Sequence, residues 1–151
     1  MDDGQPWYEE VVVPVLLRAA RRTYGSAIAA GLAEVGCDDV PRNGSYVMGA
    51  IARGGSPLSG IIKELGVSKQ AAGQLVDALV LRGYLERSPD PKDRRRLTVT
   101  LTDRGRQAAQ ASRAAVEAID AVLTARVGVE HLSHARATLG ALIDIGHARL
   151  E

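Results

Sequence analysis

The chain has 151 residues, of which 46% are hydrophobic and 25% charged, and its formal net charge at pH 7 is +1. This length suits one domain with a modest core, or a dimer that shares a core, and the composition predicts that the chain folds. The lack of a run of about 18 apolar residues argues against a membrane span. A single cysteine, Cys37, excludes an internal disulfide, and the first ten residues lack the basic-then-apolar order of a signal peptide, so we expect a cytoplasmic protein.

The first predicted helix runs from residue 9 to residue 35 and carries Pro14 in its first turns. Proline lacks an N–H and clashes with the preceding turn, so the regular helix either begins near Pro14 or is kinked there. A second helix is predicted from about 41 to 52, where Gly44 and Gly49 each weaken it by about 1 kcal/mol relative to Ala. Its predicted inward-facing residues are Tyr46, Val47, Ala50 and Ile51.

Two short amphipathic helices joined by a tight turn come next. Ser56 is suited to cap the first of them, with Pro57 as its first residue. Gly66 ends that helix because glycine tolerates the left-handed conformation, and Ser68 caps the second helix. This order is typical of a helix–turn–helix motif. The apolar stripe of the first helix, at i, i+3, i+4 and i+7, is Leu58, Ile61, Ile62 and Leu65.

The second of these helices is predicted to bury one face and to expose long polar side chains on the other. Lys69, Gln70 and Gln74 stand on the exposed side, within its N-terminal half. A recognition helix needs donors and acceptors at this end, where base edges in the major groove come within reach. The alternative is a merely solvated helix face. The residues of the predicted buried face are Ala72, Leu75, Val76, Leu79 and Val80.

A hairpin tipped with basic residues is predicted after Gly83, which ends the helix. Its strands are 84–87 and 96–101, and Pro89, Asp90 and Pro91 force the turn between them. A basic hairpin beside a recognition helix is a wing, suited to phosphates and to the minor groove, whereas the alternative is an arginine-rich soluble loop. The tip reads Lys92, Asp93, Arg94, Arg95 and Arg96.

Positive charge is concentrated in this part of the chain. The segment from 57 to 107 contains ten basic and six acidic residues, a net charge of +4, which leaves −3 for the remainder. A basic lobe of this kind is the electrostatic signature of a nucleic-acid-binding surface.

The last part of the chain is predicted to form two helices. Thr102 caps a long helix that runs to about residue 127, and Asp103 sits favourably at its positive end. Gly128 interrupts it, and a last helix follows from about 130 to 150. Both are too rich in Ala and Leu for a lone surface, so we expect them to pack in a dimer.

The wing and the helix before it resemble the MarR family of bacterial winged-helix transcriptional regulators. The motif covers about a third of the chain, and the length and helix order fit over nearly all of it. The resemblance implies a mainly α fold with a small β-hairpin wing, as a single domain over residues 1–151. Within it, 9–35 and 103–150 form the dimerisation helices and 41–101 the winged helix–turn–helix lobe. The family's wing pattern, Asp-x-Arg-x-x-x-Val-x-Leu-Thr, is matched at Asp93, Arg95, Val99, Leu101 and Thr102.

The resemblance also implies a homodimer, most often a repressor, on a pseudo-palindromic operator in double-stranded DNA. Release would come from a small-molecule ligand bound between the DNA-binding lobe and the dimer helices. Asp93, together with Arg95, is expected to fold the wing against itself, because an acid beside DNA needs a cationic partner. The residues expected at DNA are Ser68, Lys69, Gln70 and Gln74 in the recognition helix, and Lys92, Arg94, Arg95 and Arg96 in the wing.

Three alternatives remain open from the sequence. A winged helix can serve as a protein-interaction module, although such a module needs no dense cationic wing. Cys37 could sense oxidants, but its neighbours Asp38 and Asp39 disfavour a thiolate, and a small buried hydrophobe is the simpler interpretation. His131 and His134 share a helix face, whereas His147 lies more than three turns further on, so the histidines form no clear metal set. No catalytic pair, glycine-rich phosphate loop or cofactor motif appears, and we expect neither catalysis nor a cofactor.

Overall fold

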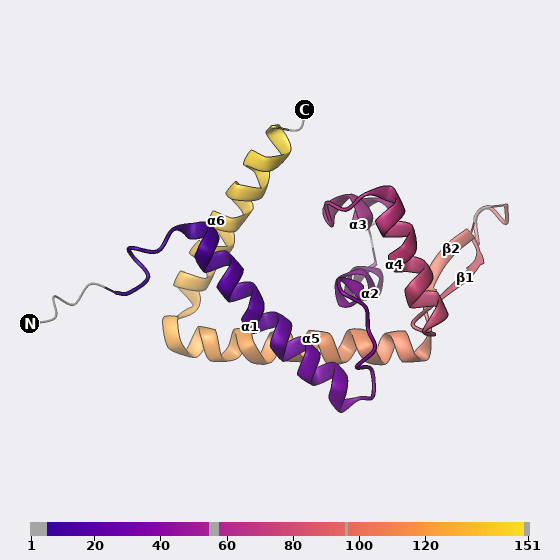
Figure 1. Cartoon of the computed structure of the whole chain (residues 1–151), viewed down its shortest axis with the longest axis horizontal. Helices are drawn as coiled ribbons and strands as arrows, with labels where there is room; N and C mark the ends of the chain where they lie inside the picture. The colour runs from indigo at the N-terminus through magenta and orange to yellow at the C-terminus, as the bar shows by residue number, and fades with distance from the viewer. Residues whose placement is uncertain (1–5, 55–57, 96, 150–151) are drawn as a thin grey trace, which may run out of the picture. The chain divides into compact units, whose positions relative to one another are not determined.

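The computed structural model describes residues 6–54, 58–95 and 97–149, and it is mainly helical with one two-stranded antiparallel sheet (Figure 1). The chain divides into two compact units, residues 1–116 and 117–151, with the boundary inside α5. The elements in chain order are α1 (Val13–Glu34), α2 (Gly44–Arg53), α3 (Leu58–Glu64), α4 (Lys69–Leu81), β1 (Leu85–Pro89), β2 (Leu97–Leu101), α5 (Asp103–Val127) and α6 (Val129–Ala148). The predicted fold class is confirmed.

The α1 helix begins at Val13, four residues later than predicted, with Pro14 in its first turn. Before it, the Glu9 amide donates to the Pro6 carbonyl at 3.0 Å and the Val11 amide to the Tyr8 carbonyl at 3.2 Å, as in turns rather than a helix. Proline is well placed at a helix start because its missing N–H has no partner there anyway. Of the two expected outcomes at Pro14, the helix start is confirmed.

Gly44 begins α2, where the sequence predicted a glycine inside the helix. A Cβ at Gly44 would lie 2.9 Å from Val40 and 3.1 Å from Leu79, so glycine allows α2 to approach α4 closely. The prediction that Tyr46 faces inward is wrong, since this side chain is 41% exposed and its hydroxyl donates to Glu64 at 2.6 Å. Among the other three residues expected to face inward, Val47 and Ala50 are buried and Ile51 is partly buried.

The first unit contains the hydrophobic core, to which α1, α2, α3, α4, the hairpin and the first half of α5 all contribute. Within α4, Ala72, Val76 and Leu79 are buried, as the helical spacing predicted. Ser56 and Pro57, the predicted start of the preceding helix, lie outside the described residues. The buried core residues are Leu32, Cys37, Val47, Met48, Ala50, Ile61, Leu79, Tyr84, Leu85, Leu101, Ala108 and Ala109.

The hairpin pairs β1 with β2 in register, from Leu85 opposite Leu101 to Pro89 opposite Leu97. It lies beside α4, at the right of Figure 1. Pro89, which was predicted in the turn, is instead the last residue of β1. Proline is tolerated there because the end of an edge strand does not need its missing N–H for the ladder.

The start of α5 is joined tightly to the start of the hairpin. The Thr102 hydroxyl accepts the Gly105 N–H at 3.0 Å, which confirms the predicted cap, and it also donates to the Gly83 carbonyl at 2.5 Å. A Cβ at Gly105 would lie 2.0 Å from the Tyr84 carbonyl oxygen, so any side chain here would displace the backbone. Gly105 is therefore required by packing.

The second unit holds the end of α5 and the whole of α6. Gly128, with φ of +83°, separates the two helices as predicted. The Asp120 carboxylate accepts a hydrogen bond from Arg136 at 3.4 Å. None of the residues of α6 is buried, and its large apolar side chains include Leu139, Leu142, Ile143 and Ile145, all between 41% and 57% exposed.

Candidate nucleic-acid interface

The polar face of α4 is set by its cap and by its buried stripe. The Ser68 hydroxyl accepts the Ala71 N–H at 3.1 Å, and the Ser68 carbonyl accepts the Ala72 N–H at 2.9 Å, so the helix begins where the sequence predicted. Because the apolar stripe faces the core, Lys69, Gln70 and Gln74 are turned to solvent, and all three are exposed.

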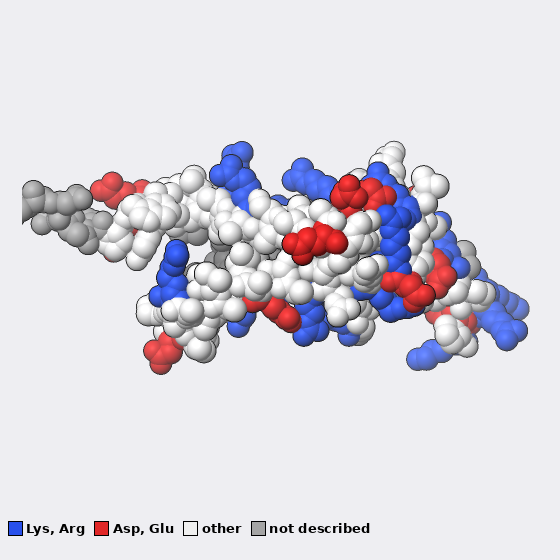
Figure 2. Space-filling view, turned by 90° about the horizontal axis from the view of Figure 1, so that it is seen from below, with Lys and Arg blue, Asp and Glu red and all other residues white. Residues whose placement is uncertain are grey.

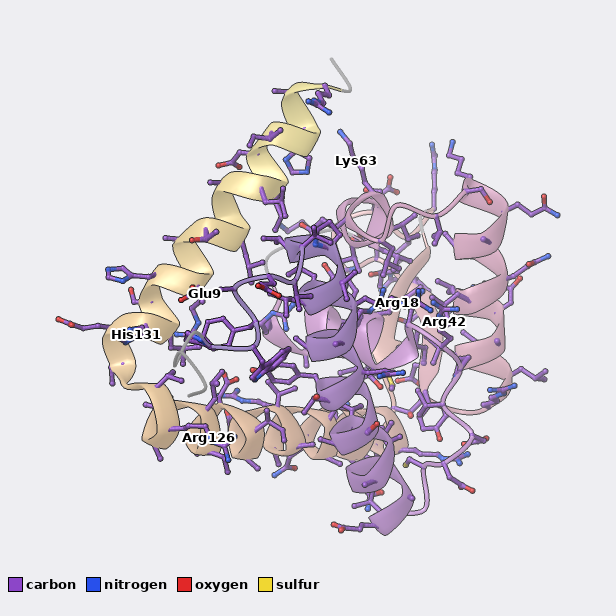
Figure 3. All side chains as sticks on the ribbon, turned by 60° about the vertical axis from the view of Figure 1, so that its left-hand side comes forward. Glu9, Arg18, Arg42, Lys63, Arg126 and His131 are labelled. Carbon is purple, nitrogen blue, oxygen red and sulfur yellow. The ribbon has the colours of Figure 1, made fainter. Side chains whose placement is uncertain are left out.

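The exposed end of α4 has the chemistry needed to read a base pair. Gln70 and Gln74 are one turn apart on the helix surface, about 5–6 Å between Cβ atoms. A glutamine amide can pair with both N6 and N7 of adenine, and Lys69 can reach guanine acceptors or a phosphate. Lys63, in the last turn of α3, is also exposed, and its side chain extends away from the ribbon (Figure 3). Both helices of the motif therefore carry exposed polar side chains, a cation on α3 and a cation with two amides on α4.

The tip of the wing is held by its own acidic residues. The Asp90 carboxylate accepts the Lys92 N–H at 2.7 Å, and the Asp93 carboxylate accepts the Arg95 N–H at 3.1 Å. Such bonds from a side chain to a backbone amide two residues on are common in turns. Asp93 thus binds the wing's own backbone, in line with the structuring role expected for it.

This arrangement leaves the cations in the described part of the tip available to a partner. Lys92, Arg94 and Arg95 are exposed and form no ion pair with another described residue. Lys and Arg side chains gather where the hairpin projects, at the right of Figure 2. Arg96, the fourth predicted cation, lies outside the described residues. The structure therefore brings the other predicted wing residues together at one tip.

An ion pair joins the wing to α4. Arg87 of β1 donates to the carboxylate of Asp77, the acidic residue within α4. The two side chains are 43% and 64% exposed, so water and salt screen the pair, which is worth no more than about 1 kcal/mol. The pair matters more for the charge of the α4 surface. Arg87 neutralises Asp77, which lies on the same exposed face as Gln70 and Gln74.

A polar cluster at the base of the wing, formed by Asp39, Arg82, Tyr84 and Arg104, was not predicted. The Asp39 carboxylate accepts hydrogen bonds from the Tyr84 hydroxyl and, at 2.9 Å, from Arg104. Arg82 donates to the Asp39 carbonyl, and Arg104 donates to the Arg82 carbonyl at 2.8 Å. The Arg104 guanidinium also lies 4.5 Å from the centroid of the Tyr84 ring. We call these four residues the Asp39 cluster.

The Asp39 cluster shifts the pKa values of Tyr84 and Asp39 in opposite directions. Burial raises the pKa of the Tyr84 hydroxyl, and the hydrogen bond that it donates to Asp39 raises it further. The same bond lowers the pKa of the Asp39 carboxyl, with help from the charges of Arg104 and Arg82. At neutral pH the cluster therefore holds a carboxylate and a neutral phenol. Outside the cluster, the hydrogen bond to Glu64 raises the pKa of Tyr46.

The residues considered for sensing are separate from the wing tip. Cys37 is 1% exposed and belongs to the hydrophobic core, where its thiol contacts the Val35 carbonyl at 3.8 Å. His131 lies in the first turn of α6 (Figure 3). Within the described ranges, no three His, Cys, Asp or Glu side chains gather as a metal site would require. Across those same ranges, none of the helices has the length and hydropathy of a bilayer span.

The helix pair, the basic hairpin and the flanking long helices define a winged helix–turn–helix protein. A sequence model described as "MarR family" matches residues 38–96, which contain α2, α3, α4, β1 and the wing tip. This part of the chain is therefore similar to the MarR family. No curated protein sequence matches the chain significantly.

Solved structures share the fold over nearly the whole chain. A complex of S. aureus MepR with DNA has a TM-score of 0.71 and 18% identity, covering 89% of this chain and 98% of that chain. The transcriptional repressor CouR, bound to a 23-mer DNA duplex, has a TM-score of 0.68 and 21% identity, covering 92% and 99%. A probable transcriptional regulator from Pseudomonas aeruginosa has a TM-score of 0.64 and 26% identity, covering 86% and 96%.

Proposed function

We propose that this protein is a DNA-binding transcriptional regulator that acts as a homodimer on double-stranded DNA. The observation that carries the proposal is one compact unit with an exposed Lys–Gln–Gln face on α4 beside a wing tip whose described cations, Lys92, Arg94 and Arg95, pair with no other described residue. Amides read base edges in the major groove, and cations bind phosphates or the narrow minor groove. MepR and CouR, which share the fold, have both been solved with DNA.

The recognition helix and the wing would then have distinct roles. Lys69, Gln70 and Gln74 would contact bases or adjacent phosphates, with Ser68 at the helix start beside them. Lys92, Arg94, Arg95 and Arg96 would contact phosphates or the minor groove, while Asp93 keeps the wing folded. Residues 41–101 would form the DNA-binding lobe of one domain that spans residues 1–151.

A second copy of the chain would complete the binding unit through residues 9–35 and 103–150. The apolar side chains that α6 exposes support this proposal, because a monomer rarely leaves such a stripe in water. A two-fold symmetric dimer recognises a pseudo-palindrome whose half-sites lie about one helical turn apart. A small molecule would release the DNA if it bound more tightly to a conformation of the dimer in which the two recognition helices no longer match the separation of the half-sites. Regulation in the cytoplasm, rather than catalysis, is the role we propose, with repression as its most usual form.

The proposal is tested by fluorescence anisotropy with two duplexes, one selected from a random library by the wild-type protein and one with the same composition in scrambled order. The wild type should bind the selected duplex at about 10⁻⁸ M or tighter, and about 10³-fold more tightly than the scrambled one. Gln74→Ala should reduce this ratio, because its amide is proposed to read a base. Lys92→Ala/Arg94→Ala should weaken binding to both duplexes and flatten the salt dependence by about one unit per lost phosphate contact.

The control for the wing variant is Arg126→Ala/Arg149→Ala, which removes two exposed cations from the second unit. If both double variants lose affinity equally, the wing has no special role and net charge explains the binding. If the wild type selects no duplex and binds none at low salt, DNA binding is wrong, and a protein-interaction module takes its place. Bound zinc, or a mass shift at Cys37, would instead favour the metal- or oxidant-sensing alternative.

A further inference from the structure

The loop between α1 and α2 is anchored in the core immediately before it reaches Asp39. Gly36, with φ of +69°, ends α1 in the left-handed conformation, and the Cys37 N–H donates to the Leu32 carbonyl at 2.8 Å. The Cys37 side chain is then buried. Asp39 is two residues further on, so its backbone has little freedom to move relative to the end of α1.

Three segments of the first unit meet at Asp39. Arg82 is the C-terminal cap of α4, Tyr84 precedes β1, and Arg104 lies in the first turn of α5. The Asp39 carboxylate receives the Tyr84 hydroxyl and Arg104, while the Asp39 carbonyl receives Arg82. One residue of the loop therefore binds the end of the recognition helix, the start of the wing and the start of the long helix.

The segment from 82 to 84 sets the angle between the two DNA-contacting elements, because it is all that separates α4 from β1. Its backbone is held on the inner side, where the Tyr84 N–H donates to the Leu79 carbonyl at 2.9 Å and the Tyr84 carbonyl accepts the Thr102 N–H at 3.1 Å. The Tyr84 side chain is fully buried, so the ring direction is fixed by packing. Asp39 adds a second restraint, on the side chains of residues 82 and 84.

We propose that Asp39 is a positioning residue for DNA recognition, which holds the wing at a fixed angle to the recognition helix through Tyr84, Arg82 and Arg104. The inference rests on the proposed DNA binding. The sign of the effect separates positioning from charge. A carboxylate repels phosphates, so removing its charge alone would leave DNA affinity unchanged or raise it. If affinity falls when Asp39 is replaced, the cause is therefore a change in the angle between the wing and the recognition helix and not the removal of a charge.

The neighbouring Asp38 provides a matched control. It is exposed, has no hydrogen bond or ion pair with a described residue, and carries the same charge on the same loop. Asp39→Ala and Asp38→Ala therefore change the net charge equally. Tyr84→Phe removes the phenolic hydroxyl but keeps the buried ring, and it serves as a gentler variant if Asp39→Ala does not fold.

DNA binding is measured by anisotropy with the selected and scrambled duplexes across a salt series. Asp39→Ala should lose about tenfold in affinity for the selected duplex, which corresponds to about 1.4 kcal/mol. Its salt dependence should match that of the wild type, because no phosphate contact is lost. Tyr84→Phe should shift in the same direction by a smaller factor, and Asp38→Ala should show no loss.

Hydrogen exchange of the free protein provides a readout that does not depend on DNA. Peptides from β1 and β2 should exchange about tenfold faster in Asp39→Ala than in Asp38→Ala, while peptides from the middle of α1 stay unchanged. Equal affinity and equal wing exchange in the two variants would overturn the positioning role. A wild type that binds no duplex would instead refute the proposed function, and the exchange data would still decide whether Asp39 restrains the wing.

Discussion

The helices α4 and α6 have similar apolar content but opposite surroundings. In α4 the stripe of Ala72, Val76 and Leu79 is buried within the first unit, so the chain itself stabilises that helix. In α6 the residues Leu142 and Ile143 are 47% and 57% exposed, and no residue of the helix is buried. The two helices show that an apolar stripe predicts burial without saying whether the covering surface comes from the same chain or from another.

The contrast also separates two kinds of stability. The first unit is stabilised by contacts within a single chain. The stability of α6 should instead depend on the surface of a second molecule that packs against its exposed apolar side chains. A substitution in α4 should therefore have the same effect at every protein concentration, if the chain remains in one oligomeric state. A substitution in α6 should act through association, which depends on concentration.

The largest expected effect is in the buried stripe of α4. Leu79→Ala removes a fully buried side chain and should lower the free energy of unfolding by about 3–4 kcal/mol, from lost burial and the cavity left behind. Leu81→Ala, in the same helix, removes a side chain that is 88% exposed and should change it by less than about 0.5 kcal/mol. Urea unfolding measures both. Similar losses for the two variants would show that α4 is not packed as described.

The next effect tests whether a second copy covers α6. Leu142→Glu places a charge in the exposed stripe and should weaken dimerisation by about 100-fold, or about 2.8 kcal/mol, as sedimentation velocity over a concentration series would show. Ser133→Glu, nine residues before Leu142, places the same charge on the opposite side of the helix and should leave the dimer intact. A dimer that survives Leu142→Glu would remove α6 from the interface.

The smallest effect concerns the proton of Tyr84. Its folded-state pKa lies above the ordinary value of 10.0, mainly because the ring is buried, so above pH 10 the folded state keeps a proton that the unfolded state releases. Stability is therefore unaffected by this group below pH 10 and falls as the pH rises above it, by about 1.4 kcal/mol per pH unit. Urea unfolding between pH 8 and pH 11 should show a shallower alkaline decline in Tyr84→Phe. An unchanged decline would mean that Tyr84 titrates normally.

Much of the helix order was predictable, because it follows from local rules. The Ser68 cap, the stripe of α4 and the breaks at Gly83 and Gly128 each depend on residues within a few positions of one another, and all four were predicted. The start of α1 near Pro14 was left as one of two options. The exposed state of Lys69, Gln70 and Gln74 follows from the stripe on the other side of α4 and is confirmed, whereas their contact with DNA remains a prediction.

The errors come from contacts between distant segments. Tyr46 fits an inward position by spacing, yet its hydroxyl is held at the surface by Glu64, 18 residues away. The Asp39 cluster joins residues up to 65 positions apart, and no periodicity marks such a set. Gly44 was interpreted as a weak point of a helix, but its role is to admit Val40 and Leu79 at close range. Patterns within a few residues of the sequence cannot predict any of these three contacts between distant segments.

The turn at the wing tip has a consequence for the kinetics of association. Because Asp90 and Asp93 already accept the backbone amides of Lys92 and Arg95, the tip is folded before any partner arrives. A preorganised loop loses little conformational entropy on binding, whereas a disordered basic tail must be ordered at that moment. Arrival at the partner should therefore be governed by diffusion and electrostatic attraction rather than by a folding step.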